Sequence, residues 1–388
     1  MLELHVPRVG DGLAVAVDGG GGVRALLDCG SRRHPYLAYC RGLLATRPSV
    51  FILSHFHIDH YSGLLQASRT RPRGGIALSD VYFPAMPDLP DGRDFLCCLF
   101  AMHHYLLGDT SGHMAVDLRE LLRHVSHTRF RCRGLSAGQT IDMGEASLQV
   151  LWPPNTVERD GAVSAAVRRA LHLFDKAKES SEELALLHDI AQDQERVFAP
   201  YLDSTDGAWV EPAEQHEGFW GSAPRLVGRA LPKAVREANE ALRVAANRLS
   251  LALCHGHDVL FLGDLEKQEI EQVVDKLARA DGLRWRTLLT AHHGTHWHES
   301  LHRLSVTWAI SSVGAELQSK VNRGYDRISD IHLTTGRCGS VTVGACLTWG
   351  SNPCCAWHSG RCLRQNVLAE CTRRITASWA SHPSRGGR

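Results

Sequence analysis

The run His55-Phe56-His57-Ile58-Asp59-His60 places four potential metal ligands within six residues. It directly follows the apolar segment Ser49–Leu53, which predicts a short buried strand. Imidazole nitrogens together with a carboxylate oxygen suit zinc or a similar transition metal. Side chains two residues apart in a tight loop can converge on one ion, while the following Asp-His pair turns toward a second. The alternative is a His-rich surface loop, which the preceding strand and the later motifs disfavour.

Two later motifs also follow apolar segments. Val259–Leu262 predicts a strand that ends in Gly263-Asp264, and Leu288–Ala291 predicts a strand that ends in His292-His293. Asp264 either caps the helix expected from Leu265 onward or binds a metal ion. A His pair by itself is more often structural or exposed than a ligand. The three motifs together, however, indicate a metal site built from strand ends.

These motifs, with the early strand end Leu27-Asp28-Cys29-Gly30, resemble the metallo-β-lactamase superfamily over most of the chain. The resemblance implies an α/β fold, the αββα sandwich, with a metal site at one edge. It also implies a role for each matching residue. His55 and His57 would bind the first metal, Asp59, His60 and His293 would bind the second, Asp264 would bridge them, and Asp28 would orient the ligand loop.

One branch of the superfamily shares further motifs. Trp152-Pro153-Pro154, Asn247–Leu251 and Ser311–Gly314 resemble the soluble hydrolase domain of the DNA-uptake competence channel protein, and phosphorylcholine-esterase-like enzymes share parts of the pattern. No stretch of this chain approaches the roughly 18 apolar residues of a membrane helix. We therefore expect a free-standing relative of that domain, with no membrane contact.

The chain also departs from the family pattern. The superfamily usually has a third His on the first metal, where this chain has Ala245-Ala246-Asn247. Asn247 is then either a weak ligand or, as we expect, a turn residue that satisfies backbone groups, and the first metal would be loosely held. Four other His residues are distant candidates without a matching context: His103, His104, His124 and His127. Gly324–Arg327 stands roughly where the branch carries Tyr-Gly-His-Pro.

The implied cofactors are two Zn²⁺ or Mn²⁺ ions about 3.5–4 Å apart that share a bridging hydroxide. Asp59 and His292 are the catalytic candidates, with His292 as a general acid or phosphate-oxygen donor, or else a prop for His293. Weaker candidates for lining the site are Thr295, His296, His298 and Tyr325. A phosphate-reading patch could form from Arg323, Arg327 and Arg337.

The order of predicted elements is β-rich, then helical, then β-rich again. We expect the first half of the core domain at 1–160, a helical insertion or cap at 161–246, the second half at 247–350, and a Cys-rich extension and tail at 351–388. In the extension, Cys354, Cys355, His358, Cys362 and Cys371 are either a small zinc knuckle or ordinary reduced residues. Gly19–Gly22 is expected to be a hairpin turn rather than a phosphate-binding loop.

Composition narrows the function classes. With 388 residues and 44% hydrophobic residues the chain can bury a large core, and a net charge of +1 gives no global attraction to nucleic acid or membrane. The start of the chain does not resemble a signal peptide and the Cys residues are scattered, so we expect a cytoplasmic protein. The leading hypothesis is a two-metal phosphodiesterase or nuclease acting on DNA, RNA or another phosphodiester. The alternatives are a carboxyl-ester or lactone hydrolase, and a degenerate scaffold that binds a partner protein through the insertion.

Overall fold

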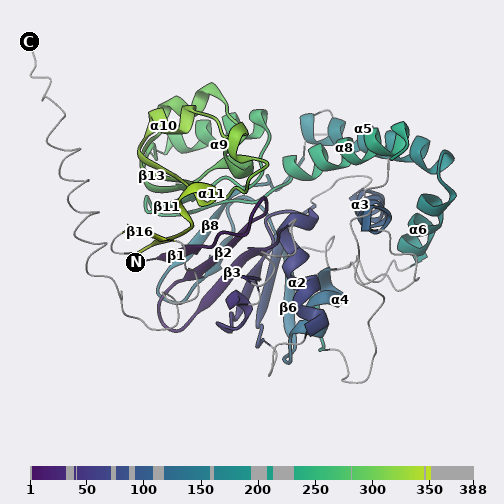
Figure 1. Cartoon of the computed structure of the whole chain (residues 1–388), viewed down its shortest axis with the longest axis horizontal. Helices are drawn as coiled ribbons and strands as arrows, with labels where there is room; N and C mark the ends of the chain where they lie inside the picture. The colour runs from purple at the N-terminus through teal and green to yellow at the C-terminus, as the bar shows by residue number, and fades with distance from the viewer. Residues whose placement is uncertain are drawn as a thin grey trace, which may run out of the picture.

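The computed structural model describes residues 2–31, 39–40, 42–70, 76–86, 92–107, 118–157, 161–193, 208–212, 231–280, 282–344 and 347–350. The Cys-rich extension at 351–388, including its candidate zinc knuckle, lies outside these residues. Two β-sheets with helices beside them make up the described chain (Figure 1).

The first sheet has nine strands in the order β16-β15-β1-β2-β3-β4-β5-β6-β9. Its strands are β1 Glu3–Val6, β2 Ala14–Asp18, β3 Arg24–Cys29, β4 Val50–Ile52, β5 Asp80–Pro84, β6 Phe130–Leu135, β9 Ala208–Val210, β15 Ser340–Val343 and β16 Leu347–Gly350. The central strands β3 to β6 run parallel, with Leu26 opposite Phe51 in the β3–β4 pair. Antiparallel pairs flank them, including the β2–β3 hairpin closed by the Gly-rich turn.

The second sheet has seven strands in the order β14-β13-β12-β11-β10-β8-β7. Its strands are β7 Thr140–Asp142, β8 Ser147–Trp152, β10 Ala252–His255, β11 Val259–Phe261, β12 Arg284–Leu289, β13 Ser305–Ser311 and β14 Ser329–Thr334. Strands β11 to β14 are parallel, and Leu260 pairs with Leu288. Both sheets therefore present the carboxyl ends of a parallel block, which is where ligand sites form in α/β proteins.

Apolar side chains point alternately to the two faces of each strand. Each sheet therefore packs against the other sheet on one face and needs helices to cover the other face. In β4, Val50 and Ile52 belong to the core shared by the two sheets, whereas Phe51 belongs to the core that contains the helices. In β11, Val259 and Phe261 likewise face the shared core, and Leu260 joins the helical one. Because neighbouring side chains on a strand point to opposite faces, each sheet buries both faces.

The helices follow from this need. The outer helices include α2 Ile58–Thr70, α4 Leu118–Val125, α9 Lys267–Arg279 and α10 Gly324–Ile328. Figure 1 shows α2 and α4 beside the first sheet and α9 and α10 with the second. The predicted α/β arrangement of two sheets between helices, the αββα sandwich, agrees with this structure.

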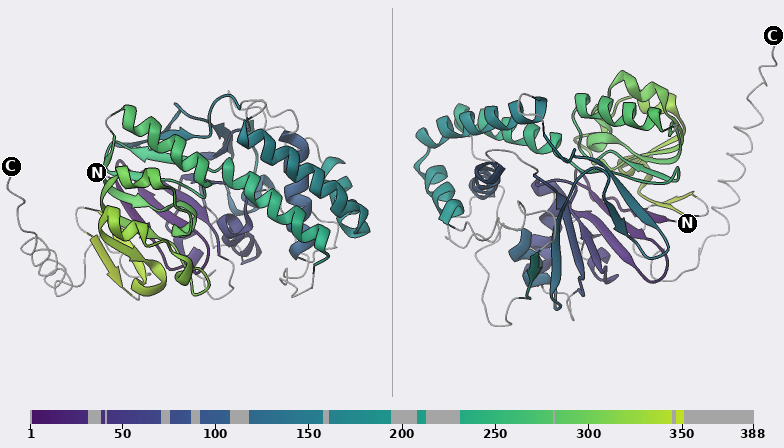
Figure 2. Two further views of the ribbon diagram at one scale, coloured as in Figure 1. Left: turned by 90° about the horizontal axis from the view of Figure 1, so that it is seen from above. Right: turned by 180° about the vertical axis from the view of Figure 1, so that it is seen from behind.

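Four helices form a separate layer to one side, which we call the helical layer (Figures 1 and 2). They are α3 Gly92–Leu107, α5 Ala162–Glu179, α6 Glu182–Asp193 and α8 Lys233–Arg248. Helix α5 packs against α8, and α3 packs against α5, α6 and α8. The expected insertion at 161–246 supplies α5, α6 and α8, but α3 comes from the preceding segment. The proposed segment boundaries stay a prediction.

Among the described residues, no helix combines the length and the apolar character that crossing a bilayer requires. The strands β6, β9, β14 and β16 were not predicted from the sequence. In β6, Arg131 and Arg133 interrupt the apolar pattern of Phe130–Leu135, although every second residue is buried. The expected cytoplasmic location stays a prediction.

Candidate metal centre

The His-rich run is the loop that leads from β4 into α2. His55 and His57 lie in the loop, and Asp59 and His60 lie in the first turn of α2. All four side chains are buried, so this is not an exposed His-rich loop. The short strand β4 lies between β3 and β5, and the loop therefore starts at the carboxyl edge of the parallel block.

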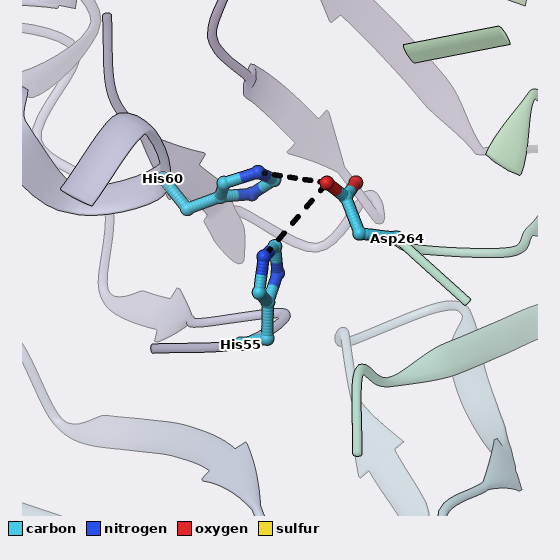
Figure 3. Close-up of side chains that lie close together, drawn as sticks. All are labelled: His55, His60 and Asp264. Carbon is cyan, nitrogen blue, oxygen red and sulfur yellow. Dashed lines mark ion pairs between the residues drawn. The ribbon is translucent and has the colours of Figure 1, made fainter. Parts of the chain in front are cut away.

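Asp264 brings the three motifs together. Its Oδ2 atom lies 3.8 Å from His55 Nε2 and 3.5 Å from His60 Nε2, as Figure 3 shows. The same oxygen lies 3.7 Å from His292 Nε2 and 3.6 Å from His293 Nε2. These separations exceed a hydrogen bond and are close to the roughly 3.3 Å between two N or O ligands of one tetrahedral zinc ion. Asp264 therefore faces four imidazoles rather than capping a helix.

The other ring nitrogens are held in place. His60 Nδ1 is 2.8 Å from Asp28 Oδ2, and His293 Nδ1 is 2.8 Å from the Ser312 carbonyl oxygen. The Nε2 atoms of His60 and His293 are buried and have no hydrogen-bond partner. An imidazole anchored at Nδ1 with a bare Nε2 is the arrangement that metal-binding His residues adopt. The donor set therefore fits a metal ion at the Nε2 side.

Two groups of ligand atoms can be separated within the cluster. His55, His60 and Asp264 form one, and Asp59, His60 and His293 form the other, with the ligand atoms of each group within 4.8 Å of one another. These His/Asp groups could hold metal ions. The structure thus brings together the residues that the sequence assigned to the second metal, and His60 belongs to both groups.

His57 joins the cluster through His55. Its Nδ1 atom is 2.8 Å from His55 Nε2, and its Nε2 atom is buried without a hydrogen-bond partner. His103, a distant candidate in the sequence, lies beside it with ring centroids 6.4 Å apart. The Nδ1 atom of His103 is 2.8 Å from the Tyr61 hydroxyl oxygen. His103 on α3 therefore borders the cluster beside His57.

The electrostatics follow from burial and from Asp264. Burial lowers the pKa of His55 and His57 well below the usual value, with nearby His residues adding to the effect. Burial also opposes protonation of His60, but the carboxylates of Asp264 and Asp28 outweigh it and raise the pKa of His60. The burial of Asp264 is likewise outweighed by the imidazoles around it, which hold its pKa well below the usual value. Asp264 is thus a buried anion.

The backbone is strained at this site. Asp28, His292 and His293 have φ angles of 56°, 46° and 59°, which non-glycine residues rarely adopt. Each such residue costs about 1–3 kcal/mol and persists only where the surroundings impose it. Among the described residues, Arg47 is the one other non-glycine residue with a positive φ. The strain therefore gathers at the carboxyl edge that carries the cluster.

A second polar group borders the cluster beside His292. Asn247 Nδ2 donates to Glu266 Oε1 at 2.9 Å and lies 3.4 Å from His292 Nδ1. His296 Nδ1 is 3.1 Å from His292 Nδ1. Our expectation that Asn247 is a turn residue that satisfies backbone groups is wrong, because it lies in the last turn of α8 and its side chain bonds to Glu266. Its Oδ1 is buried without a hydrogen-bond partner.

His292 itself faces a cation. Its Nε2 atom is 3.4 Å from Arg243 Nη1, and Arg243 also bonds to Glu240. Burial lowers the pKa of His292 to about 3. Arg243 and Glu266 carried no motif that sequence reasoning could use. Arg243 lies 49 residues before His292 along the chain, so the sequence pattern does not predict that the two side chains meet.

The weaker candidates have other contacts. Tyr325 is buried, donates to the His296 carbonyl oxygen at 2.7 Å and accepts from the Ala291 N–H at 3.2 Å, so it supports the His292 turn. Thr295 Oγ1 donates to the His292 carbonyl oxygen at 2.7 Å. His298 accepts from the Ser300 N–H at 3.2 Å and caps a short helix. His127 and the three Arg candidates are exposed: Arg323, Arg327 and Arg337.

A groove of about 910 Å³ lies in the helical layer between α5 and α8 rather than at the His/Asp cluster. Its lining includes Ala162, Ala166, Ala241, Arg169 and Arg236. The expectation that the insertion caps the site or contacts a partner protein stays a prediction.

Comparison with known proteins gives a distant structural likeness. Neither protein-family models nor curated proteins produced a match. Among solved structures, the chain is similar to the metallo-β-lactamase fold protein YhfI from Bacillus subtilis, with 10% identity and a TM-score of 0.39. The likeness covers 88% of this chain and 99% of that one. The resemblance to the competence-channel branch stays a prediction.

Proposed function

We propose that the chain is a metal-dependent hydrolase of the metallo-β-lactamase type, and that it cleaves phosphodiesters. The observation that carries the proposal is the Asp264 carboxylate, which faces the Nε2 atoms of His55, His60, His292 and His293 at 3.5–3.8 Å. The buried, unpartnered Nε2 atoms of His60 and His293 support it.

The ligands would divide between two cations, Zn²⁺ or Mn²⁺. His55 and His57 would hold the first, Asp59, His60 and His293 would hold the second, and Asp264 would contact both. Such cations, when bound, activate a water molecule and neutralise charge on the scissile group. Asp28 would accept a hydrogen bond from His60 Nδ1–H, so that a bound cation would take the place of the proton on Nε2.

The remaining chemistry belongs to the chain's own groups. Asp59, our candidate for catalysis as well as for metal binding, would orient the attacking water through its carboxylate. His292 Nε2 accepts from Arg243 Nη1 at 3.4 Å, so His292 would hold this guanidinium in place to bind a substrate oxygen. A guanidinium group beside the centre favours an anionic substrate, and therefore a phosphodiester over a neutral ester. DNA and RNA are the polymeric phosphodiesters to test.

The test compares wild type with the variant Asp59→Ala/His60→Ala. Metal per chain is measured by elemental analysis, and cleavage is measured with bis-p-nitrophenyl phosphate, labelled single- and double-stranded oligonucleotides and p-nitrophenyl acetate. We expect two metal ions at the centre and phosphodiester cleavage, both lost in the variant. A control variant, Asp330→Ala/His302→Ala, changes exposed residues of the same types and should retain both.

The other outcomes separate the alternatives. Preference for p-nitrophenyl acetate or a lactone would replace the phosphodiesterase with an ester hydrolase that uses the same centre. Absence of both metal and cleavage would overturn the hydrolase and favour a scaffold that binds a partner protein.

A further inference from the structure

A second group of metal-ligating side chains lies in the helical layer. Asp94 and Cys98 are four residues apart on α3, so they lie on one face of that helix. His188, on α6, faces both of them: its Nε2 atom is 3.1 Å from Asp94 Oδ1 and 3.6 Å from Cys98 Sγ. The three ligand atoms lie within 4.8 Å of one another. None of these residues belongs to the motifs that predicted the Asp264 centre.

The spacing matches one tetrahedral ion. Zinc bonds of about 2.0 Å to O, 2.0–2.1 Å to N and 2.3 Å to S place N and O ligands about 3.3 Å apart and N and S ligands about 3.6 Å apart. The observed separations are 3.1 Å and 3.6 Å. A group that brings S, N and O donors to these distances suits Zn²⁺ and disfavours Mg²⁺ or Ca²⁺, which take oxygen ligands.

Burial shapes access to this group. Cys98 and His188 are 1% and 2% exposed, whereas the Asp94 side chain is 44% exposed. An ion can therefore reach the group from the Asp94 side. Gln192 Nε2 donates to Asp94 Oδ1 at 3.2 Å and holds that carboxylate in place. Burial and the nearby Asp94 charge raise the pKa of the Cys98 thiol well above its usual value, which disfavours an activated nucleophile here.

We propose that Asp94, Cys98 and His188 form a zinc site, separate from the Asp264 centre, that joins α3 to α6. A water molecule would complete the four ligands on the exposed side. The site would fix α3, which packs against α5, α6 and α8, and so hold the helical layer together.

Zinc binding at this site changes where the protons of His188 and Cys98 lie. Without metal, His188 Nε2–H donates to Asp94, and Lys178 Nζ donates to His188 Nδ1 at 3.4 Å. When zinc binds, the Cys98 thiol releases its proton to solvent, and the imidazole proton moves from Nε2 to Nδ1. Lys178 then leaves Nδ1 and keeps its partner Asp175, 3.0 Å away. One proton is released for each zinc ion bound.

The test uses the full chain, stripped of metal with a chelator and reloaded with Co²⁺ or Zn²⁺. A thiolate bound to Co²⁺ gives a charge-transfer band in the near ultraviolet, which the N and O ligands of the Asp264 centre do not give. We expect this band in wild type and its loss in Cys98→Ser and His188→Gln, with one fewer zinc ion per chain. Cys97→Ser, which changes the adjacent buried Cys, is the matched control and should retain both.

Substitution of the buried Cys98 or His188 can prevent folding. Asp94→Asn provides a second test, because the half-exposed Asp94 side chain tolerates substitution better. We expect its zinc affinity at this site to fall at least ten-fold in a chelator competition. A folded Cys98→Ser variant with the full band and zinc content would overturn the proposal, as would unchanged zinc affinity in Asp94→Asn. The Asp59→Ala/His60→Ala variant should retain the band. The band therefore tests the helical-layer site even if the hydrolase proposal fails.

Discussion

At the scale of single residues, the centre depends on which ring nitrogen carries a proton. His60 can offer Nε2 to a cation, in exchange for the proton there, because Asp28 accepts a hydrogen bond from Nδ1–H at 2.8 Å. Asp28 is fixed in turn by the Ser54 N–H at 2.7 Å and the Ser54 hydroxyl at 2.6 Å. A buried carboxylate thus sets the chemistry of an imidazole without itself reaching the ion. The left-handed backbone at Asp28 is part of that arrangement.

This chain of contacts predicts the effect of Asp28→Asn. The amide would place N–H donors against His60 Nδ1 and favour the tautomer with a proton on Nε2. We expect metal affinity or activity to fall about 10- to 100-fold, as for other groups that orient a metal-binding His. Affinity is measured by competition with a chromophoric chelator.

Asp11→Asn is the control for burial. Asp11 is also a buried carboxylate, but it accepts from the backbone N–H groups of Gly314 and Leu317 at 2.8 and 3.0 Å. Metal affinity should stay unchanged in that variant even where its thermal stability falls. Equal metal affinity in folded Asp28→Asn and wild type would show that Asp28 does not set the His60 tautomer.

At the scale of elements, the centre requires close approach between backbones. Gly30, just after β3, allows the first turn of α2 to pass: a Cβ atom there would lie 2.0 Å from the Asp59 carbonyl oxygen. Gly30→Ala must therefore displace the turn that carries Asp59 and His60. We expect a loss of about 1–3 kcal/mol or more of unfolding free energy, together with weaker metal binding.

Gly344→Ala is the matched control for Gly30→Ala. The nearest atom to its new Cβ would be Glu3 Cγ at 3.5 Å, an ordinary contact. Urea unfolding and metal titration of both variants give the measurement. If Gly30→Ala kept the stability and metal affinity of the control, close packing of the β3 end against α2 would not be needed for the site.

The β1–β15 pair gives the fold a pH dependence away from the centre. His5 Nδ1 is 2.8 Å from Thr342 Oγ1, and burial lowers the pKa of His5 to about 4. The folded chain therefore holds His5 neutral while the unfolded chain protonates it near 6.5. This contribution is present in full above about pH 6.5 and is lost as the pH falls toward 4, by about 3 kcal/mol in total.

His5→Gln removes the titrating group from this pair. The unfolding free energy of the variant should fall less than that of wild type between pH 7 and 4, because its side chain does not gain a proton. Urea unfolding at several pH values measures the difference. Parallel pH dependence in the two proteins would show that His5 titrates alike in the folded and unfolded chains.

The elements also show what the sequence could and could not predict. The apolar runs before His55, Asp264 and His292 are short and end abruptly, so strand ends with ligands could be predicted from pattern alone. The Asn247 contact and the position of His103 could not, because each depends on how α8 and α3 pack. The Asp94, Cys98 and His188 group was missed for the same reason: its third member lies 90 residues beyond Cys98 along the chain.

At the scale of the whole molecule, the centre connects the two sheets. His55, Asp59 and His60 follow β4 of the nine-stranded sheet, while Asp264 and His293 follow β11 and β12 of the seven-stranded one. An ion held by both groups can bind only where the two sheets are packed together. Its binding free energy is therefore added to the free energy of unfolding.

Metal removal should consequently lower the thermal stability of the whole fold. At free Zn²⁺ one hundred times the dissociation constant, one site adds about 2.7 kcal/mol. Calorimetry of zinc-loaded and chelator-treated protein measures the change in melting temperature. The same measurement on variants shows how much of that change each metal site contributes. Asp264→Asn should remove the stabilisation by metal at the Asp264 centre, and Cys98→Ser should remove the stabilisation by zinc at the helical-layer site. If the chelator removed all metal and the melting temperature did not change, the ions would not be bound between the packed sheets, and the ligand assignment would be wrong.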